Sequence, residues 1–112
     1  MELEQRVKKI ESIKGYKGSA ILNKTGEIIY IDESQTIDLA FSSSLFNDTF
    51  RILNEASLDI GLTPLIRLEA ETDEGMVFMI YSNHKQTIFA IFDSKGNISL
   101  AKMVLDQLLK KV

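Results

Sequence analysis

Two neighbouring segments, "MVFMIYS" at 76–82 and "TIFAIFD" at 87–93, are apolar on both faces. Successive side chains of a strand point to opposite faces of the sheet, so a strand with one face in water alternates between apolar and polar residues. Neither segment shows that alternation. We therefore predict two central strands in a sheet that is covered by helices on both sides. Short polar turns at 73–75 and 83–86 precede them.

The two ends of the chain predict amphipathic helices. Apolar residues recur every three or four positions in residues 2–13 and again from residue 98, which gives each helix one narrow apolar stripe. Gly15 ends the first helix, and Asn97 is a good N-cap for the last. The stripes consist of Leu3, Val7, Ile10 and Ile13, and of Ile98, Ala101, Val104, Leu105, Leu108 and Leu109.

Three further strands are predicted. The aliphatic runs 17–24 and 27–32 flank a tight turn in which Gly26 can adopt a positive φ, and they form a hairpin. Segment 64–72 has one apolar and one charged face, as expected of an edge or partly exposed strand. Its apolar face consists of Ile66, Leu68 and Ala70, and its charged face of Arg67, Glu69 and Glu71.

The middle segment, 36–60, has helical periodicity, but apolar side chains cover too much of its circumference. At about 100° per residue they form two stripes. Ser34 or Thr36 is the expected N-cap and Gly61 the expected C′ residue. The first stripe contains Ile37, Phe41, Leu45, Ile52 and Ala56, the second contains Leu39, Phe46, Phe50, Leu53 and Ile60, and the remaining arc contains Asn47, Arg51 and Asn54.

These elements predict an α+β fold with the order α-β-β-α-β-β-β-α, in a single domain over residues 1–112. In this fold one long helix covers one face of a five-stranded antiparallel sheet and the two terminal helices cover the other. A chain of 112 residues with 45% hydrophobic content can form one such core. One stripe of the middle helix packs on its own sheet, so the other needs a different cover.

A second copy of the chain is the expected cover, because monomeric soluble proteins rarely leave a long apolar stripe exposed. Neighbouring loops or the chain's own hairpin are the alternative. The edge strand can pair with its symmetry mate. The expected homodimer interface is therefore Ile37, Phe41, Leu45, Ile52 and Ala56 of the middle helix, with Arg67 and Glu69 of the third strand.

Two longer segments carry a resemblance to a known family. "IKGYKGSAILNKTGEIIYID" at 13–32 and "IFAIFDSKGNISLAKMVLDQL" at 88–108 resemble the first hairpin and the last strand and helix of the Roadblock family of dynein light chains and their bacterial relatives. That fold is related to longin and profilin-like domains. The resemblance implies an obligate or near-obligate dimer with middle helices side by side and third strands paired. It also implies a regulator or scaffold that contacts a small Ras-like GTPase through the helical face.

Composition excludes several other functions. The formal charge of −3 and pI near 5.1 give no general reason to bind nucleic acid or an anionic membrane. The absence of cysteine excludes thiol chemistry and fits a reducing cytoplasm. No stretch approaches the roughly 18 apolar residues of a membrane span. "KGYKGSA" at 14–20 lacks the Lys-Ser/Thr ending of a phosphate loop and is expected to be a helix stop followed by a closely packed strand.

No assembled catalytic, cofactor or metal site is apparent, so we expect a non-enzyme. His84 is expected to be a solvated turn residue. The acidic residues between 69 and 74 lack the spacing of a calcium loop, and the serines at 42–44 have no base and are expected to let helices approach closely. Arg51 is the candidate for contact with a partner. The alternative functions are a profilin-like small-molecule sensor with a pocket lined by Phe78, Tyr81 and Phe89, or a structural subunit of a larger complex.

Overall fold

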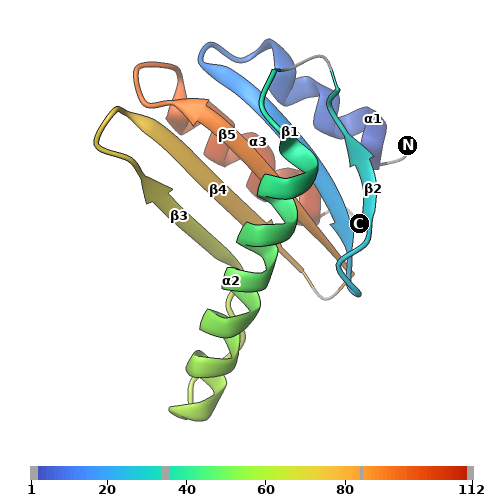
Figure 1. The fold of residues 1–112 in the computed structure, drawn as a ribbon, viewed down its shortest axis with the longest axis vertical. Helices are drawn as coiled ribbons and strands as arrows, with labels where there is room; N and C mark the ends of the chain where they lie inside the picture. The colour runs from blue at the N-terminus through green and yellow to red at the C-terminus, as the bar shows by residue number, and fades with distance from the viewer. Residues whose placement is uncertain (1–2, 34–35, 84, 111–112) are drawn as a thin grey trace.

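One antiparallel sheet organises the molecule, with strands in the order β2-β1-β5-β4-β3 (Figure 1). The computed structural model describes residues 3–33, 36–83 and 85–110. The predicted positions of the strands are confirmed: β4 and β5 lie inside the sheet, whereas β3 forms one edge. The strands are β1 (Tyr16–Asn23), β2 (Ile28–Ile31), β3 (Arg67–Glu71), β4 (Met76–Ser82) and β5 (Gln86–Asp93).

Helices cover both faces of this sheet, as β4 and β5 require. The terminal helix α1 (Leu3–Val7) continues as a 3-10 turn, η1 (Lys8–Ser12), and packs with α3 (Ile98–Lys110) on one face. The long helix α2 (Leu39–Asp59) crosses the other face (Figure 1). Strand β5 serves both cores, because Ala90 points to the α1 and α3 side and Phe89 to the α2 side. The predicted α+β fold and helix layout are confirmed.

Helix α2 begins at Leu39 and not at residue 36. Its N-cap is Asp38, whose Oδ1 accepts a hydrogen bond from the Phe41 amide at 3.1 Å. The predicted cap Thr36 therefore precedes the helix, and the other predicted cap, Ser34, lies outside the described residues. Aspartate is as good an N-cap as serine, and it also places a negative charge at the positive end of the helix dipole.

The C-terminal turns of α2 extend past the end of the sheet (Figure 1). Gly61 has a φ of +88° and is the C′ residue, as predicted. Its amide donates to the Leu58 carbonyl at 3.0 Å, and the next amide, of Leu62, donates to the Ser57 carbonyl at 2.9 Å. These two bonds close the helix so that the chain can turn back toward the sheet.

The returning segment is bonded to α2 before it joins the sheet. The Ser57 hydroxyl donates to the Thr63 carbonyl at 2.7 Å, and Asn54 Oδ1 accepts from the Leu65 amide at 2.8 Å. Pro64, between them, has no amide to give to a strand ladder. Strand β3 therefore starts at Arg67, later than the predicted start at residue 64.

The "KGYKGSA" segment is a helix stop and a close contact, as predicted. Gly15 has a φ of +95°, which favours glycine. A Cβ on Gly18 would lie 2.7 Å from a methyl group of Leu39. The first glycine therefore allows the turn into β1, and the second lets the start of α2 lie close against that strand.

A buried polar cluster joins β1 to the residue after β2. The Tyr16 hydroxyl donates to Asp32 Oδ2 at 2.6 Å and lies 2.8 Å from Ser19 Oγ. Asp32 is 7% exposed. Burial is the main cause that raises the pKa of Tyr16 well above its ordinary range, and the hydrogen bond to Asp32 raises it further.

We expect Tyr16→Phe to lower stability by about 1–3 kcal/mol at neutral pH, because buried Asp32 loses a donor. The unfolded tyrosine ionises near pH 10. The folded residue keeps its proton to higher pH, so its contribution is full below that pH and is lost as pH rises toward the folded pKa. Urea unfolding across alkaline pH should therefore show a shallower loss of stability in the variant. Equal slopes in the two proteins would contradict this assignment.

Candidate interaction surface

The outward face of α2 carries an apolar stripe that no other described part of the chain covers. Phe41 is 65% exposed, Leu45 51% and Ile52 67%, and Ala56 is also exposed. We call these four residues the outer stripe. The alternative, that the chain's own loops or hairpin cover them, is wrong for the described residues. Ile37, the fifth predicted member, precedes the helix and is half-buried against the α2-side core.

The inward face of α2 packs on the sheet through aromatic and aliphatic side chains. Leu39 and Phe50 are buried, as predicted for the second stripe. Phe46 stacks on Phe78, with ring centroids 4.7 Å apart, and on Phe89, at 5.4 Å. These contacts fix which side of α2 faces the sheet and leave the outer stripe pointing away from it.

The other two members of the second stripe, Leu53 and Ile60, are 40% and 74% exposed. Their predicted burial is wrong because this end of α2 extends beyond the strands (Figure 1). Ile60 is moreover the C-cap residue, one position beyond the last residue of α2. They enlarge the apolar surface toward the C-terminal end of α2.

Three polar residues of α2 lie inward, contrary to the sequence interpretation. Ser43 is fully buried, and its hydroxyl donates to the Ala40 carbonyl at 3.3 Å. Asn47 is 8% exposed beside the β1–β2 turn, where a Cβ on Gly26 would lie 3.4 Å from its Nδ2. Asn54 is half-buried against the return loop. Of the three residues on the remaining arc, Asn47 and Asn54 therefore contact neighbouring loops, and Arg51 is exposed.

Strand β3 offers an open backbone edge. The Ser82 amide donates to the Ile66 carbonyl, and the Thr72 amide donates to the Met76 carbonyl, both at 2.8 Å. Alternate residues of an antiparallel strand bond to alternate sides. The N–H and C=O groups of Arg67, Glu69 and Glu71 therefore point away from β4, toward the edge of the sheet.

The side chains of Arg67 and Glu69 lie on the α3 side of the sheet. Glu69 Oε2 is 2.9 Å from Lys102 Nζ, and Arg67 Nη1 is 4.0 Å from Asp106 Oδ1. The Glu69 contact raises the pKa of Lys102. All four side chains are well exposed, so each ion pair adds little stability. These two predicted interface residues therefore present their backbone at the edge, while their side chains lie on the opposite face of the sheet from α2.

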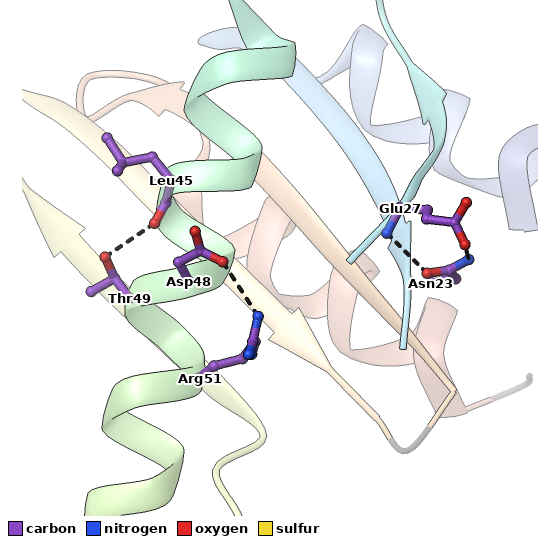
Figure 2. Close-up of polar contacts among 6 residues, drawn as sticks. All are labelled: Asn23, Glu27, Leu45, Asp48, Thr49 and Arg51. Carbon is purple, nitrogen blue, oxygen red and sulfur yellow. Dashed lines mark hydrogen bonds and ion pairs between the residues drawn. The ribbon is translucent and has the colours of Figure 1, made fainter. Parts of the chain in front are cut away.

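Arg51 lies on the flank of α2, next to the outer stripe. Its Nη1 is 3.4 Å from Asp48 Oδ1, and both side chains are about two-thirds exposed (Figure 2). A solvated pair of this kind is weak. The guanidinium can therefore exchange Asp48 for an anionic group on a partner. Figure 2 also places the β1–β2 turn, closed by Asn23 and Glu27, beyond this flank of the helix.

The aromatic residues suggested for a sensor pocket do not line one space. Phe78 and Phe89 stack against Phe46 and fill the region between the sheet and α2. Tyr81 faces the opposite core. It borders a shallow cavity of about 250 Å³ between β3 and α3, and Ile66 and Leu109 also line this cavity. The structure therefore gives no support to the small-molecule alternative.

Neither a metal site nor a membrane span is found within residues 3–33, 36–83 and 85–110. No group of three or more His, Asp or Glu side chains there is placed to hold a metal ion. None of the helices in those ranges combines the length and the apolar character needed to cross a bilayer. His84 lies outside the described residues.

Comparisons with known proteins were informative at the level of structure. No family model and no curated protein matches the sequence. A Roadblock/LC7 domain from Streptomyces avermitilis superposes with a TM-score of 0.82 at 10% identity, over 100% of this chain and 95% of the other. Myxococcus xanthus MglB superposes with a TM-score of 0.75 at 16% identity, over 95% of this chain and 84% of the other. The gliding protein MglB from Thermus thermophilus superposes with a TM-score of 0.77 at 11% identity, over 96% of this chain and 86% of the other. The fold is Roadblock-like.

Proposed function

We propose that this chain is a non-catalytic interaction module that forms a homodimer and regulates or scaffolds a small Ras-like GTPase in the cytoplasm. The observation that carries the proposal is the exposed outer stripe of α2 in a molecule that also has an open β3 edge. The Roadblock-like fold supports it, because the sequence resemblance implies dimers that act on such GTPases.

The outer stripe supplies enough apolar surface for a dimer. Burying the three large side chains from each of two copies contributes at most roughly 9–18 kcal/mol. Association costs about 4–15 kcal/mol in lost motion and side-chain ordering. A twofold contact uses the same patch on both copies, so each favourable contact occurs twice.

The open edge of β3 supports the same twofold arrangement. Its outward N–H and C=O groups, at Arg67, Glu69 and Glu71, can bond to the same groups of a second copy and extend the sheet. The axis of such a pair is perpendicular to the sheet and brings the two α2 helices onto one common face. The two helices then lie side by side, and the part of each outer stripe that can meet the partner is its flank toward β3, where Leu45 lies (Figure 2).

A GTPase partner fits the chemistry of this helical face. The chain has no phosphate loop, so any nucleotide would be held by the partner. Arg51 adds an exposed guanidinium beside the apolar surface, able to bind a carboxylate or phosphate group. Within this proposal Arg51 is a contact residue and not a catalytic one.

The test is capture of GTPases from the native lysate on the immobilised protein, with the lysate supplied with GDP or a non-hydrolysable GTP analogue. We expect a small Ras-like GTPase to be retained in one nucleotide state and identified by mass spectrometry. Arg51→Ala should weaken binding of the purified GTPase about tenfold, as expected from loss of one charge-assisted contact. Lys95→Ala, in the turn before α3, should bind as the wild type does.

Phosphate release by the purified GTPase then separates the two roles. Acceleration by the chain identifies an activator, and an unchanged rate with retained binding identifies a scaffold. Retention of no GTPase in either nucleotide state would overturn the GTPase part of the proposal.

A further inference from the structure

The C-terminal end of α2 carries a second apolar surface, separate from the outer stripe. Leu58 lies on the last turn of the helix, Ile60 is its C-cap, and Leu62 begins the segment that returns to the sheet. Their exposed fractions are 46%, 74% and 62%. We call these three residues the apolar tip. Because this end of α2 extends beyond the strands, the sheet does not cover it (Figure 1).

The way the helix ends explains why Leu62 is exposed. The Gly61 amide bonds to the Leu58 carbonyl and the Leu62 amide to the Ser57 carbonyl, which is a common closing motif of helices. In that motif the residue after the glycine often packs on an apolar side chain five positions earlier. Here that position is Ser57, whose hydroxyl donates to the Thr63 carbonyl. Leu62 therefore gains little cover from its own helix.

Hydrogen bonds hold the apolar tip in place before any partner binds. The Ser57 hydroxyl and the Asn54 side chain tie the returning segment to α2, at Thr63 and Leu65. The bonds that close the helix use backbone atoms of the tip and not its side chains. A surface that is already held in its bound conformation loses little conformational entropy on association. Large apolar side chains exposed on such a rigid surface mark an interaction site.

A cavity of about 250 Å³ adjoins the apolar tip, where α2, the returning segment and the end of β4 meet. Phe50, Pro64 and Leu65 line it. Ile66, which lines it as well, is 57% exposed. An apolar pocket of this kind accepts a single side chain of a partner, and such anchors contribute much of the affinity of protein interfaces.

The charge around the apolar tip has one sign. Residues 52–66 contain Glu55 and Asp59 and no Lys, Arg or His. Both carboxylates are exposed, and within the part of the chain that the structure describes neither forms an ion pair. Arg51 and Arg67, on either side of this segment, each contact an aspartate elsewhere. A cationic partner therefore complements the surroundings of the tip.

We infer that the apolar tip is a docking site for a segment of a partner protein in which large aliphatic side chains are flanked by lysine or arginine. The aliphatic side chains pack on Leu58, Ile60 and Leu62, and one of them enters the adjoining cavity. The cations pair with Glu55 and Asp59. This site is separate from the proposed GTPase surface and does not depend on it.

The proposed dimer leaves both copies of the site available. Antiparallel pairing of two β3 strands places the start of one strand beside the end of the other. Because the returning segment leads from the apolar tip to the start of β3, the two tips lie at opposite ends of such a dimer. Each dimer then offers two docking sites.

The probe for the test is a fluorescent amphipathic helical peptide of leucine and lysine, compared with a peptide of the same length in which glutamate replaces lysine. Fluorescence anisotropy measures the binding of each peptide to the full chain. We expect the lysine peptide to bind about tenfold more tightly than the glutamate peptide, because only its charges complement Glu55 and Asp59.

Two serine variants locate the bound peptide. Ile60→Ser, Leu62→Ser should weaken binding of the lysine peptide about tenfold. Both side chains are exposed and the closing bonds use backbone atoms, so thermal unfolding should change little. The matched control, Phe41→Ser, Ile52→Ser, removes two exposed apolar side chains from the outer stripe. It should bind the peptide as the wild type does, since each chain keeps its own tip.

A second pair of variants tests the charge. Glu55→Gln, Asp59→Asn keeps the size of both side chains and should weaken binding about tenfold and reduce its salt dependence. Glu27→Gln, Glu33→Gln makes the same change in net charge beside β2 and should have little effect. Equal losses in these two variants would show that net charge alone attracts the peptide and would overturn the choice of a basic partner.

The remaining outcomes concern what covers the tip. Equal losses in the two serine variants would place the peptide on the outer stripe and overturn the docking site. If Ile60→Ser, Leu62→Ser changes the mass found by light scattering, a second copy covers the tip. If it abolishes GTPase capture, the GTPase does. Either result overturns the inference of a separate basic partner, whereas unchanged mass and capture with selective loss of the lysine peptide support it.

Discussion

Replacing Phe41 and Ile52 by aspartate in the same chain is expected to produce a folded monomer. Both side chains are about two-thirds exposed in the single chain, so the charges remain hydrated in the monomer. In the proposed dimer they would be buried without partners, which costs several kcal/mol per ion. A loss of about 4 kcal/mol raises the dissociation constant about 1,000-fold. Size-exclusion chromatography with light scattering measures this change, and circular dichroism checks the fold.

A charge-matched control separates this effect from a general effect of added charge. Ile29→Asp with Met103→Asp changes two side chains that are 40% and 53% exposed and lie outside the outer stripe. We expect this variant to remain a dimer. A wild-type monomer at high concentration, or a dimer that persists in the Phe41→Asp, Ile52→Asp variant, would refute the role of the outer stripe.

Phe89→Ala is expected to cause the largest loss of folding stability among single substitutions considered for this chain. The ring is 1% exposed, with centroids 5.4 Å from Phe46 and 6.3 Å from Phe78. Removing such a ring costs about 3–5 kcal/mol, because the cavity cannot fully collapse. Domains of this size are stable by only about 5–15 kcal/mol in total. Urea unfolding would measure the difference in unfolding free energy between the wild type and Phe89→Ala.

This measurement is cleanest in the Phe41→Asp, Ile52→Asp background, where dissociation of a dimer does not contribute. The control is Leu45→Ala, which removes an apolar side chain that is 51% exposed. We expect it to change stability by no more than about 1 kcal/mol. Similar losses for Phe89→Ala and Leu45→Ala would contradict the assignment of the α2-side core.

The fold was predictable because its strongest signals are local. Strands β4 and β5 are apolar on both faces, which requires cover on both sides, and that requirement orders the helices around them. Glycine and asparagine at the ends of helices act through their own backbone and nearest neighbours. Gly61 and Asn97 were therefore identified from sequence alone.

The surface of α2 was only partly predictable, because burial depends on what lies nearby in space. Asn47 faces inward since the β1–β2 turn comes close to it, and Asn54 does so since it bonds the return loop. Leu53 belongs to the same predicted stripe as Phe50 but is 40% exposed, whereas Phe50 is buried. Helical periodicity gives an angle around the axis and carries no information on where the sheet stops.

The candidate interface was likewise predictable only in part. The exposed stripe residues Phe41, Leu45 and Ile52 follow from periodicity once one face of α2 is assigned to the sheet. The side of the sheet on which Arg67 and Glu69 place their side chains depends on the register of β3 with β4, and the sequence did not supply it. Their contacts with α3 are visible only in the folded chain.

The charged residues of β3 have a consequence for solubility before assembly. An unpaired edge strand is a template for uncontrolled growth of β-structure, including fibrils built from many chains. Arg67, Glu69 and Glu71 place charge at every second position of a short strand. Stacking of many identical strands in parallel register would repeat like charges along the fibril, whereas a single twofold contact ends after two copies. We therefore expect these charges to oppose fibrillar aggregation while the edge is still open.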